Sequence, residues 1–304
     1  WCRQCDSKGD GIDYLREAEG MTFAEACEAL HVEHKIQGST DGRGVRPSGR
    51  VAKSVGKVYS RPSCTAPPNA KWRRSAEAFV ARCERWLWSE RGAAALEWLR
   101  GRGFCDSLLK AARIGYHPST AWEQASAWGL EGEHQVLADG IVIPWIIEGD
   151  VWKLNVRLGR ETRVWYRGQG EVPPKYRCVK GSRNALYGAN LVLPERPVVL
   201  VEGEFDALTI RQEARELATA VATGSTSGAR RLRWKVRLQR ASKVLVAFDS
   251  DEAGEEAAKY WLDELPNARR WRPYWGDVND LLTDGEDIGE WVRAGLELRC
   301  AVPA

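Results

Sequence analysis

Two short apolar runs, each followed by an amphipathic helical pattern, constrain the fold of this 304-residue chain more than any other feature. Val198 to Val201 and Val244 to Phe248 are continuous and rich in valine, which is typical of strands buried on both faces of a parallel sheet. Helical patterns follow them over about residues 206–217 and 254–265. This alternation predicts an α/β domain with a parallel sheet over residues 196–290.

The chain before this domain has a different pattern. Residues 71 to about 130 carry helical spacings of apolar side chains. Two β-rich runs, 140–147 and 151–157, then flank the Glu148-Gly149-Asp150 turn and predict a pair of strands. We therefore expect a mixed α+β subdomain over residues 71–195, placed before the α/β domain.

Composition excludes several classes of protein. The chain is 43% hydrophobic, which is enough to build two cores, but its apolar runs are far shorter than the roughly 20 residues that span a bilayer, so we expect no membrane association. Lys and Arg number 45 against 42 Asp and Glu, so any nucleic-acid contact must come from local basic patches. Eight irregularly spaced cysteines favour a reducing, cytoplasmic compartment over a disulfide framework.

Acidic residues stand directly after the strand candidates. Glu202 follows the first run, Asp249 and Asp251 follow the second, Asp206 begins the helix after the first, and Asp277 follows a weaker third segment. Because the carboxyl ends of parallel strands meet at one edge of a sheet, we expect these side chains to lie close together. Gathered carboxylates repel one another unless a cation lies among them, and oxygen ligands of this kind suit Mg²⁺ or Mn²⁺. The pattern favours phosphoryl or nucleotidyl transfer.

A simpler interpretation of the same acids stays open. Acidic residues after strands are often helix N-caps or solvated turn residues with no further role. Two glycines favour the functional interpretation, because Gly203 would let the chain turn after Glu202 and Gly254 would open the next helix.

Three segments together resemble a known family. They are Val201 to Leu208, Ala247 to Gly254 and Asp277 to Leu282, and they resemble the successive motifs of a TOPRIM domain in the version found in bacterial and phage DnaG-type primases. The resemblance continues upstream through 95–104, the Ile141-Val142-Ile143-Pro144 strand, Pro174-Lys175-Tyr176 and Leu186-Tyr187-Gly188, and so covers roughly residues 90–285.

The resemblance assigns roles to individual residues. It implies that Glu202, Asp249 and Asp251 bind the catalytic divalent ions, with Asp206 and Asp277 as supporting acids. It also implies that two basic residues, Arg157 and Lys175, lie near the template and the nucleotide phosphates; without it, both would be interpreted as surface charges. Asn279 departs from the pattern, because cellular primases usually carry a second Asp there.

The N-terminal segment resembles half of a zinc-binding module. Residues 1–37 contain Cys2-x-x-Cys5 and two helical patterns, which are similar to the second half of the primase zinc ribbon. A structural Zn²⁺ site needs four ligands, so we expect this chain to bind zinc weakly or not at all, and a longer product to bind one ion. Residues 38–70 form a basic linker that either contacts template phosphate or only tethers the module, and 291–304 form a C-terminal tail.

These observations predict an enzyme that makes RNA primers on single-stranded DNA from ribonucleoside triphosphates. The setting would be replication of a phage or other mobile element, a plasmid or a bacterial chromosome, with a replicative helicase as partner. One alternative is a TOPRIM-type metal-dependent nuclease, and another is a nucleic-acid-binding module whose catalytic site has decayed. Four tryptophans could serve as stacking platforms for bases, although their helical spacing favours core packing: Trp72, Trp86, Trp88 and Trp98.

Overall fold

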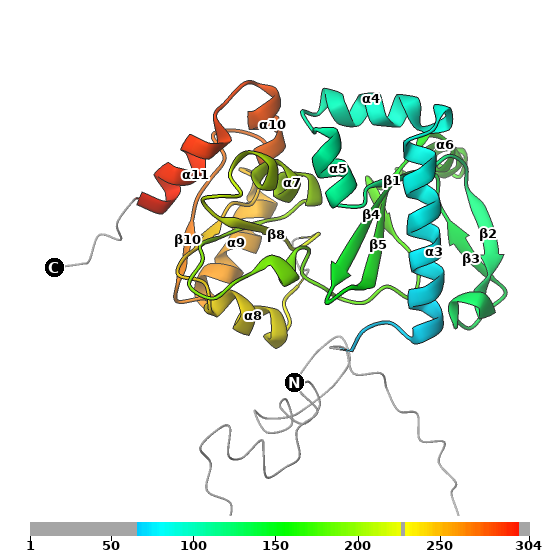
Figure 1. The fold of residues 1–304 in the computed structure, drawn as a ribbon, viewed down its shortest axis with the longest axis horizontal. Helices are drawn as coiled ribbons and strands as arrows, with labels where there is room; N and C mark the ends of the chain where they lie inside the picture. Colours follow the sequence, from blue (N-terminus) through cyan, green and yellow to red (C-terminus); the bar gives the residue numbers. More distant parts are fainter. Residues whose placement is uncertain (1–65, 226–228, 298–304) are drawn as a thin grey trace, which may run out of the picture. The chain divides into compact units, whose positions relative to one another are not determined.

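The computed structural model describes residues 66–225 and 229–297 (Figure 1). The predicted zinc module with Cys2 and Cys5, and all but the last residues of the predicted basic linker, lie outside the described residues. Among the helices that are described, none is long and apolar enough to cross a membrane.

An antiparallel sheet with the strand order β1-β4-β5-β6 forms the first part of the structure. Its strands are β1 (Gly115–His117), β4 (Gly140–Ile147), β5 (Asp150–Leu158) and β6 (Tyr176–Cys178). The predicted pair of strands around the 148–150 turn is confirmed by β4 and β5, which pair from Gly140↔Leu158 to Ile147↔Asp150. The long helix α3 (Ala70–Leu87) packs along this sheet, because its apolar stripe of Trp72, Phe79 and Val80 is completely buried.

Smaller elements surround this sheet. They are η1 (Glu90–Gly92), α4 (Ala93–Gly101), α5 (Asp106–Ala111), η2 (Ala125–Trp128), α6 (Arg160–Gly168), η3 (Ala189–Leu191) and the antiparallel pair of β2 (Ala121–Gln124) and β3 (His134–Leu137). The expectation of helix through residue 130 is wrong for 115–124, which contain β1, β2 and the short connection between them. Tyr116 and Trp122 alternate there with smaller or polar residues, a strand pattern too short to register against the helical spacing around it.

A parallel sheet with the strand order β10-β9-β7-β8 forms the second part. Its strands are β7 (Val198–Val201), β8 (Thr219–Ala222), β9 (Val244–Val246) and β10 (Ala268–Arg270). The helices of this part are α7 (Glu204–Glu213), α8 (Leu232–Gln239), α9 (Glu252–Glu264), α10 (Val278–Thr283) and α11 (Ile288–Glu297). The predicted fold class, a mixed α+β region followed by an α/β domain with a parallel sheet, is confirmed.

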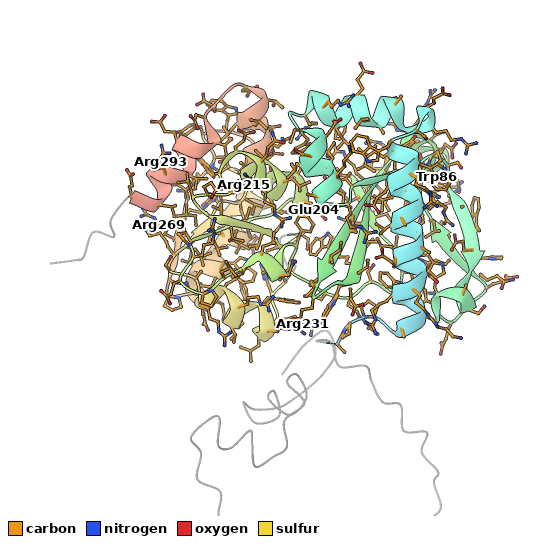
Figure 2. The ribbon with its side chains drawn as sticks, viewed as in Figure 1. Trp86, Glu204, Arg215, Arg231, Arg269 and Arg293 are labelled. Carbon is orange, nitrogen blue, oxygen red and sulfur yellow. The ribbon has the colours of Figure 1, made fainter. Side chains whose placement is uncertain are left out.

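The helices cover both faces of the parallel sheet. Helix α7 lies against β7 and β8 and carries α10 and α11 on its outer side, whereas α8 and α9 lie on the other face, joined by the Lys235–Glu264 ion pair (Figure 1). One continuous apolar core runs from Ile143 and Trp145 of β4 into the parallel sheet, so the two sheets are packed as one body. Figure 2 places Glu204 in this shared region, away from Trp86 on α3.

The predicted domain boundaries stay predictions. Helix α11 runs across the predicted boundary between residues 290 and 291, and the shared core crosses the one between 195 and 196.

Candidate active site

The strand order brings two of the predicted acids side by side. Strand β8 lies on one side of β7, and β9, which comes later in the chain, lies on its other side, with Val198 beside Val244. This change of direction leaves a crevice beyond the carboxyl ends of β7 and β9, where ligands bind in open α/β sheets. Glu202 directly follows β7 and Asp249 follows β9 after three residues, so both stand at that crevice.

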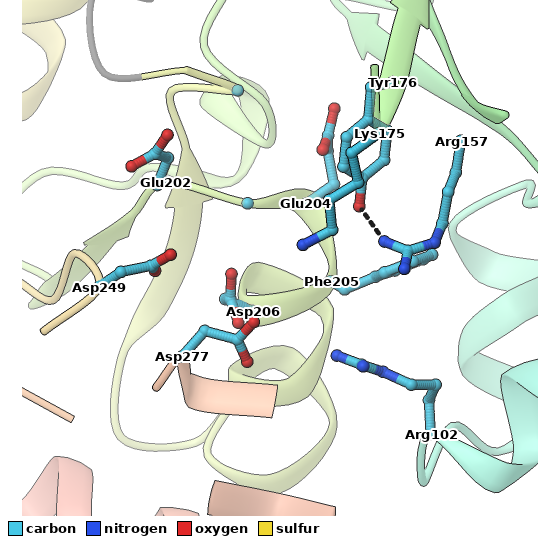
Figure 3. Close-up of a pocket in the computed structure, with 12 residues that line it drawn as sticks. Arg102, Arg157, Lys175, Tyr176, Glu202, Glu204, Phe205, Asp206, Asp249 and Asp277 are labelled. Carbon is cyan, nitrogen blue, oxygen red and sulfur yellow. Dashed lines mark hydrogen bonds between the residues drawn. The ribbon is translucent and has the colours of Figure 1, made fainter. Parts of the chain in front are cut away.

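A narrow pocket of about 170 Å³ opens at this point (Figure 3). Its acidic lining residues are Glu202, Glu204, Asp206, Asp249 and Asp277, and its basic ones are Arg102, Arg157 and Lys175. The volume is below the roughly 300–1,000 Å³ of pockets that enclose a whole organic ligand. The pocket therefore has room for a cation or phosphate groups, while the rest of a nucleotide would lie outside it.

Asp206 is the most deeply placed of these acids. Its side chain is buried, and its Oδ1 accepts a hydrogen bond of 3.0 Å from the backbone N–H of Asn279. Burial, together with the neighbouring charge of Asp277 and a hydrogen bond between the two side chains, raises the pKa of Asp206 well above its usual range. Burial therefore disfavours the ionised form of Asp206 in the absence of a bound cation.

Gly203 was predicted to let the chain turn after Glu202, but its backbone conformation does not require glycine. Its backbone is extended, with φ −93° and ψ 151°. A Cβ at this position would lie 2.5 Å from Oδ2 of Asp206, too close for any side chain to fit without displacing that carboxyl. Glycine therefore lets the Asp206 carboxyl approach the backbone closely at this position.

The two acids at the crevice repel each other and resist ionisation. Burial, together with the charges of Asp277 and Asp251 and against the opposing charge of Lys175, raises the pKa of Asp249 to about 6. Burial and the charges of Asp249 and Asp251 also raise the pKa of Glu202. Stored repulsion of this kind is relieved by a bound cation.

The simpler interpretation of the acids also holds for two of them. Asp251 is the N-cap of α9, where its Oδ1 accepts a 2.7 Å hydrogen bond from Gly254 N–H, and it is exposed. Asp277 is the N-cap of α10 and accepts from Asp280 N–H at 2.8 Å. Asp277 nevertheless lines the pocket, whereas Asp251 stands beside it and is absent from its lining.

The donor set fits a hard divalent cation. Over residues 66–225 and 229–297, no three His, Cys, Asp or Glu side chains are close enough together to hold one metal ion by themselves. Mg²⁺ commonly keeps several waters and takes only one or two protein carboxylates. Glu202 and Asp249, with raised pKa values at one crevice, supply that number.

The basic side of the pocket comes from the antiparallel sheet. The Arg157 guanidinium donates to Tyr176 Oη at 3.1 Å and lies 4.9 Å from the ring centre of Trp98 and 5.7 Å from that of Phe205. It forms no ion pair with any carboxylate in the described part of the chain. Lys175, just before β6, is exposed at the mouth. Aromatic rings hold Arg157 in place and leave its charge available to an anion.

Sequence reasoning missed three residues of the site. Arg102 directly follows α4 and was not predicted as a site residue, but it lines the pocket and lies 3.9 Å from Asp280. Tyr176 and Glu204 are also part of the lining. Glu204 accepts hydrogen bonds from Trp145 Nε1 at 2.9 Å and Asn155 Nδ2 at 2.7 Å, which ties the first turn of α7 to the antiparallel sheet.

Most of the tryptophans considered as possible stacking platforms for bases pack in the protein core instead. Trp72 is completely buried, and Trp86 and Trp88 pack against the cores. Trp98 differs, because it is 37% exposed and borders the pocket through its contacts with Arg157 and Phe205.

Comparison with known proteins fits this geometry. Residues 199–282 match the family model described as Toprim-like. A DNA primase of Deinococcus radiodurans is 26% identical over 97% of this chain and 52% of its own length. A DNA primase domain from Pseudomonas aeruginosa superposes with a TM-score of 0.58 at 20% identity, covering 75% of this chain and 78% of that one. The fold is that of the DnaG primase catalytic core.

The resemblance predicted from the sequence, to DnaG-type primases with a TOPRIM domain, is confirmed. A DnaG catalytic domain solved bound to single-stranded DNA also superposes, with a TM-score of 0.55 at 18% identity over 75% of this chain and 78% of that one. The chain spans about half the length of the curated primases it matches.

Proposed function

We propose that this chain catalyses DNA-templated synthesis of short RNA primers, that is, transfer of nucleotidyl groups from ribonucleoside triphosphates to a growing 3′ end. One observation carries the proposal. Acids from the parallel sheet face cations from the antiparallel sheet across one narrow pocket, within a chain that has the DnaG core fold (Figure 3). A reaction between a triphosphate and a 3′ hydroxyl needs both kinds of charge.

Glu202 and Asp249 would hold Mg²⁺ or Mn²⁺, with Asp251 and Asp277 beside them and Asp206 as a supporting acid. Bound there, the ion would supply a positive charge that stabilises the negative charge developing on phosphate oxygens. The protein's own residues bind and orient. Arg157 and Lys175 would hold phosphates of the nucleotide or template, and buried Asp206 would hold the start of α10 in place through the hydrogen bond that it accepts from Asn279 N–H.

The template would be single-stranded DNA, as in the DnaG domain solved bound to it. A replicative helicase as partner and zinc in a complete N-terminal module also remain predictions. We place the activity in replication, in a bacterial or phage-infected cell.

The test is primer synthesis by the full chain on unlabelled single-stranded DNA with labelled ribonucleotides and Mg²⁺ or Mn²⁺. The chain is expected to make short RNA products, and the Glu202→Gln/Asp249→Asn variant none above background. Metal-dependent cutting of the DNA without RNA synthesis would overturn the proposal in favour of a nuclease. Neither synthesis nor cutting by the folded wild-type chain would favour a decayed binding module instead.

A further inference from the structure

Arg270, the last residue of β10, is buried although it carries a charge. Its side chain is 9% exposed, and in the parallel ladder it stands beside Val246, the last residue of β9. The ladder ends there, with a bond from Trp271 N–H to Val246 O. The chain that leaves β9 runs on for three more residues to Asp249 of the acidic pocket. These residues therefore lie past the end of their neighbouring strand β10.

The guanidinium of Arg270 continues the pairing that β10 no longer supplies. Its Nη1 donates to Val246 O at 2.9 Å, and its Nη2 donates to Phe248 O at 2.9 Å and to Asp249 O at 3.2 Å. Carbonyl groups inside a protein need such donors, because an unsatisfied one is costly. A guanidinium presents its donors in a rigid planar fork, so this one side chain fixes the path of the backbone up to Asp249.

The carbonyl group of Asp249 is enclosed from a second direction. A Cβ on Gly254 would lie 2.3 Å from Asp249 O, so the first turn of α9 packs directly against that oxygen. The carbonyl is thus held by both Arg270 and α9. Because the carbonyl carbon is bonded to Cα, this contact fixes the point from which the Asp249 side chain projects into the pocket.

A carboxylate on α9 holds the guanidinium of Arg270 in its orientation. Oε1 of Glu255 accepts from Arg270 Nη2 at 2.6 Å and from Arg270 Nε at 3.1 Å. Arg272 donates to the same carboxylate, to Oε1 at 2.8 Å and to Oε2 at 2.7 Å. The hydrogen bonds from the two arginines lower the pKa of Glu255 to about 2, so it stays ionised and balances the buried charge.

We propose that Arg270 is a positioning residue for the cation site: it holds the backbone of Phe248 and Asp249 so that the Asp249 carboxylate stays in the pocket that it shares with Glu202. The inference rests on the proposed function, in which these two acids hold Mg²⁺ or Mn²⁺. Mg²⁺ demands near-ideal ligand geometry, and groups that orient a metal ligand typically contribute about 10- to 100-fold in affinity. Loss of the guanidinium should therefore weaken cation binding although both carboxylates remain.

The test is titration of the full chain with Mn²⁺ alone, with free Mn²⁺ measured by its electron paramagnetic resonance signal. Arg270→Met keeps an unbranched stem but removes the donors, and should weaken Mn²⁺ binding about tenfold. Arg270→Lys keeps the charge without the planar fork and should recover only part of the affinity. If Arg270 acts through Asp249, the Arg270→Met/Asp249→Asn variant should bind no more weakly than Asp249→Asn alone.

Arg113→Met is the matched control for a loss of stability. Arg113 is 28% exposed and forms ion pairs with two carboxylates of α3, at 2.8 Å to Glu84 and 2.7 Å to Glu77. Arg113→Met should lower the temperature of thermal unfolding, as Arg270→Met does, and leave Mn²⁺ affinity unchanged. In primer synthesis, Arg270→Met should need about tenfold more Mg²⁺ for half of its maximal rate, and saturating Mg²⁺ should restore most of kcat.

Three results would overturn the inference. The first is Mn²⁺ binding within twofold of wild type by Arg270→Met that is folded at the assay temperature. The second is an equal loss of Mn²⁺ affinity in Arg113→Met, because the effect would then follow stability and not the position of Asp249. The third is a further loss when Arg270→Met is added to Asp249→Asn.

The Mn²⁺ titration needs no RNA synthesis, so it separates this inference from the proposed function. Mn²⁺ binding that depends on Arg270, in a wild-type chain that makes no primers, would sink the proposed function and keep the positioning role. Primer synthesis by the wild-type chain with Mn²⁺ binding independent of Arg270 would sink the positioning role alone. A wild-type chain that binds no Mn²⁺ would overturn both.

Discussion

The two sheets that meet at the acidic pocket hold their charges in opposite ways. The parallel sheet gathers acids on the loops after its strands, where burial and mutual repulsion raise the pKa of Glu202, Asp206 and Asp249. The antiparallel sheet supplies Arg157 from within a strand, where aromatic rings surround it. Repulsion among the acids destabilises the acidic side until a cation binds. On the basic side, the guanidinium of Arg157 is already stabilised by the aromatic rings around it.

This difference indicates that the acidic side binds cations and the basic side binds phosphates. A site that stores repulsion binds cations strongly because ligation relieves it, and a site whose guanidinium is held by rings can accept a phosphate without rearranging.

Removing one acid at the crevice has the largest expected effect. Asp249→Asn keeps the size of the side chain but removes the charge that would hold the cation, so primer synthesis should fall by at least about a hundredfold. The measurement is initial rate against Mg²⁺ concentration. Asp263→Asn, the same substitution on an exposed position of α9, should retain wild-type rates. Equal losses in the two variants would contradict the assignment of Asp249.

An additional buried acid beside the parallel sheet should destabilise the folded protein. Asn279 is fully buried, and its Nδ2 donates to Arg102 O at 3.0 Å and Thr209 Oγ1 at 2.9 Å. Asn279→Asp would lose these donors and place another buried carboxyl near Asp206, so stability should fall by roughly 2–4 kcal/mol at pH 7. Urea unfolding measures this, with exposed Asn190→Asp as the control. The loss should shrink at pH 4, and a constant loss would argue against a charge effect.

The sequence predicted the site residues of the parallel sheet better than those of the antiparallel sheet. Glu202 and Asp249 were predictable because each follows an apolar run, and the ends of neighbouring parallel strands must meet. Strand β8, Thr219–Ala222, was missed because Thr-Ala-Val-Ala is too short and too small in its side chains to stand out from the loops around it.

The basic side was less predictable from physics alone. Arg157 alternates with buried Val156 on β5, and nothing in that alternation says which face meets the acids; only the family resemblance indicated it. Arg102 and Glu204 were missed because their roles depend on contacts between the two sheets, which local patterns do not encode. Helix α6 was also unpredicted, since Arg160–Gly168 has only short polar and aromatic runs.

Changing the basic side should affect substrate binding without changing the acids. Arg157→Ala removes the guanidinium that its rings hold toward the pocket, so kcat/KM for ribonucleotides should fall about ten- to hundredfold, and Arg157→Lys should recover part of it. Steady-state rates at varied nucleotide measure this, with Arg293→Ala on α11 as the control. Full recovery by lysine would show that a point charge suffices and that the ring-held geometry is irrelevant.

Lowering the pH should weaken cation binding by the acids of the parallel sheet. Because the pKa of Asp249 is raised to about 6, it takes up a proton as pH falls through that value and ceases to hold a cation. Primer synthesis at low Mg²⁺ should therefore drop about tenfold per pH unit below 6. Protons and the ion compete, so more Mg²⁺ should move the midpoint to lower pH. A midpoint independent of Mg²⁺ would assign the loss to another group.

The charge of Asp249 should also have a small effect on the stability of the folded protein without a bound ion. Asp249 has a folded pKa above its unfolded value, so the folded state binds more protons between about pH 4 and 6 and loses stability as pH rises through that window. Asp249→Asn should consequently raise stability at pH 7 by roughly 1 kcal/mol, the full shift being discounted because the carboxyl is partly solvated. Thermal unfolding without divalent ions measures the gain, and Mg²⁺ should stabilise the wild-type chain more than the variant. Arg157→Met is the counterpart on the antiparallel side and should give no gain, because its charge is not repelled by its neighbours. Stabilisation by both changes would mean that the two sheets hold their charges in the same way.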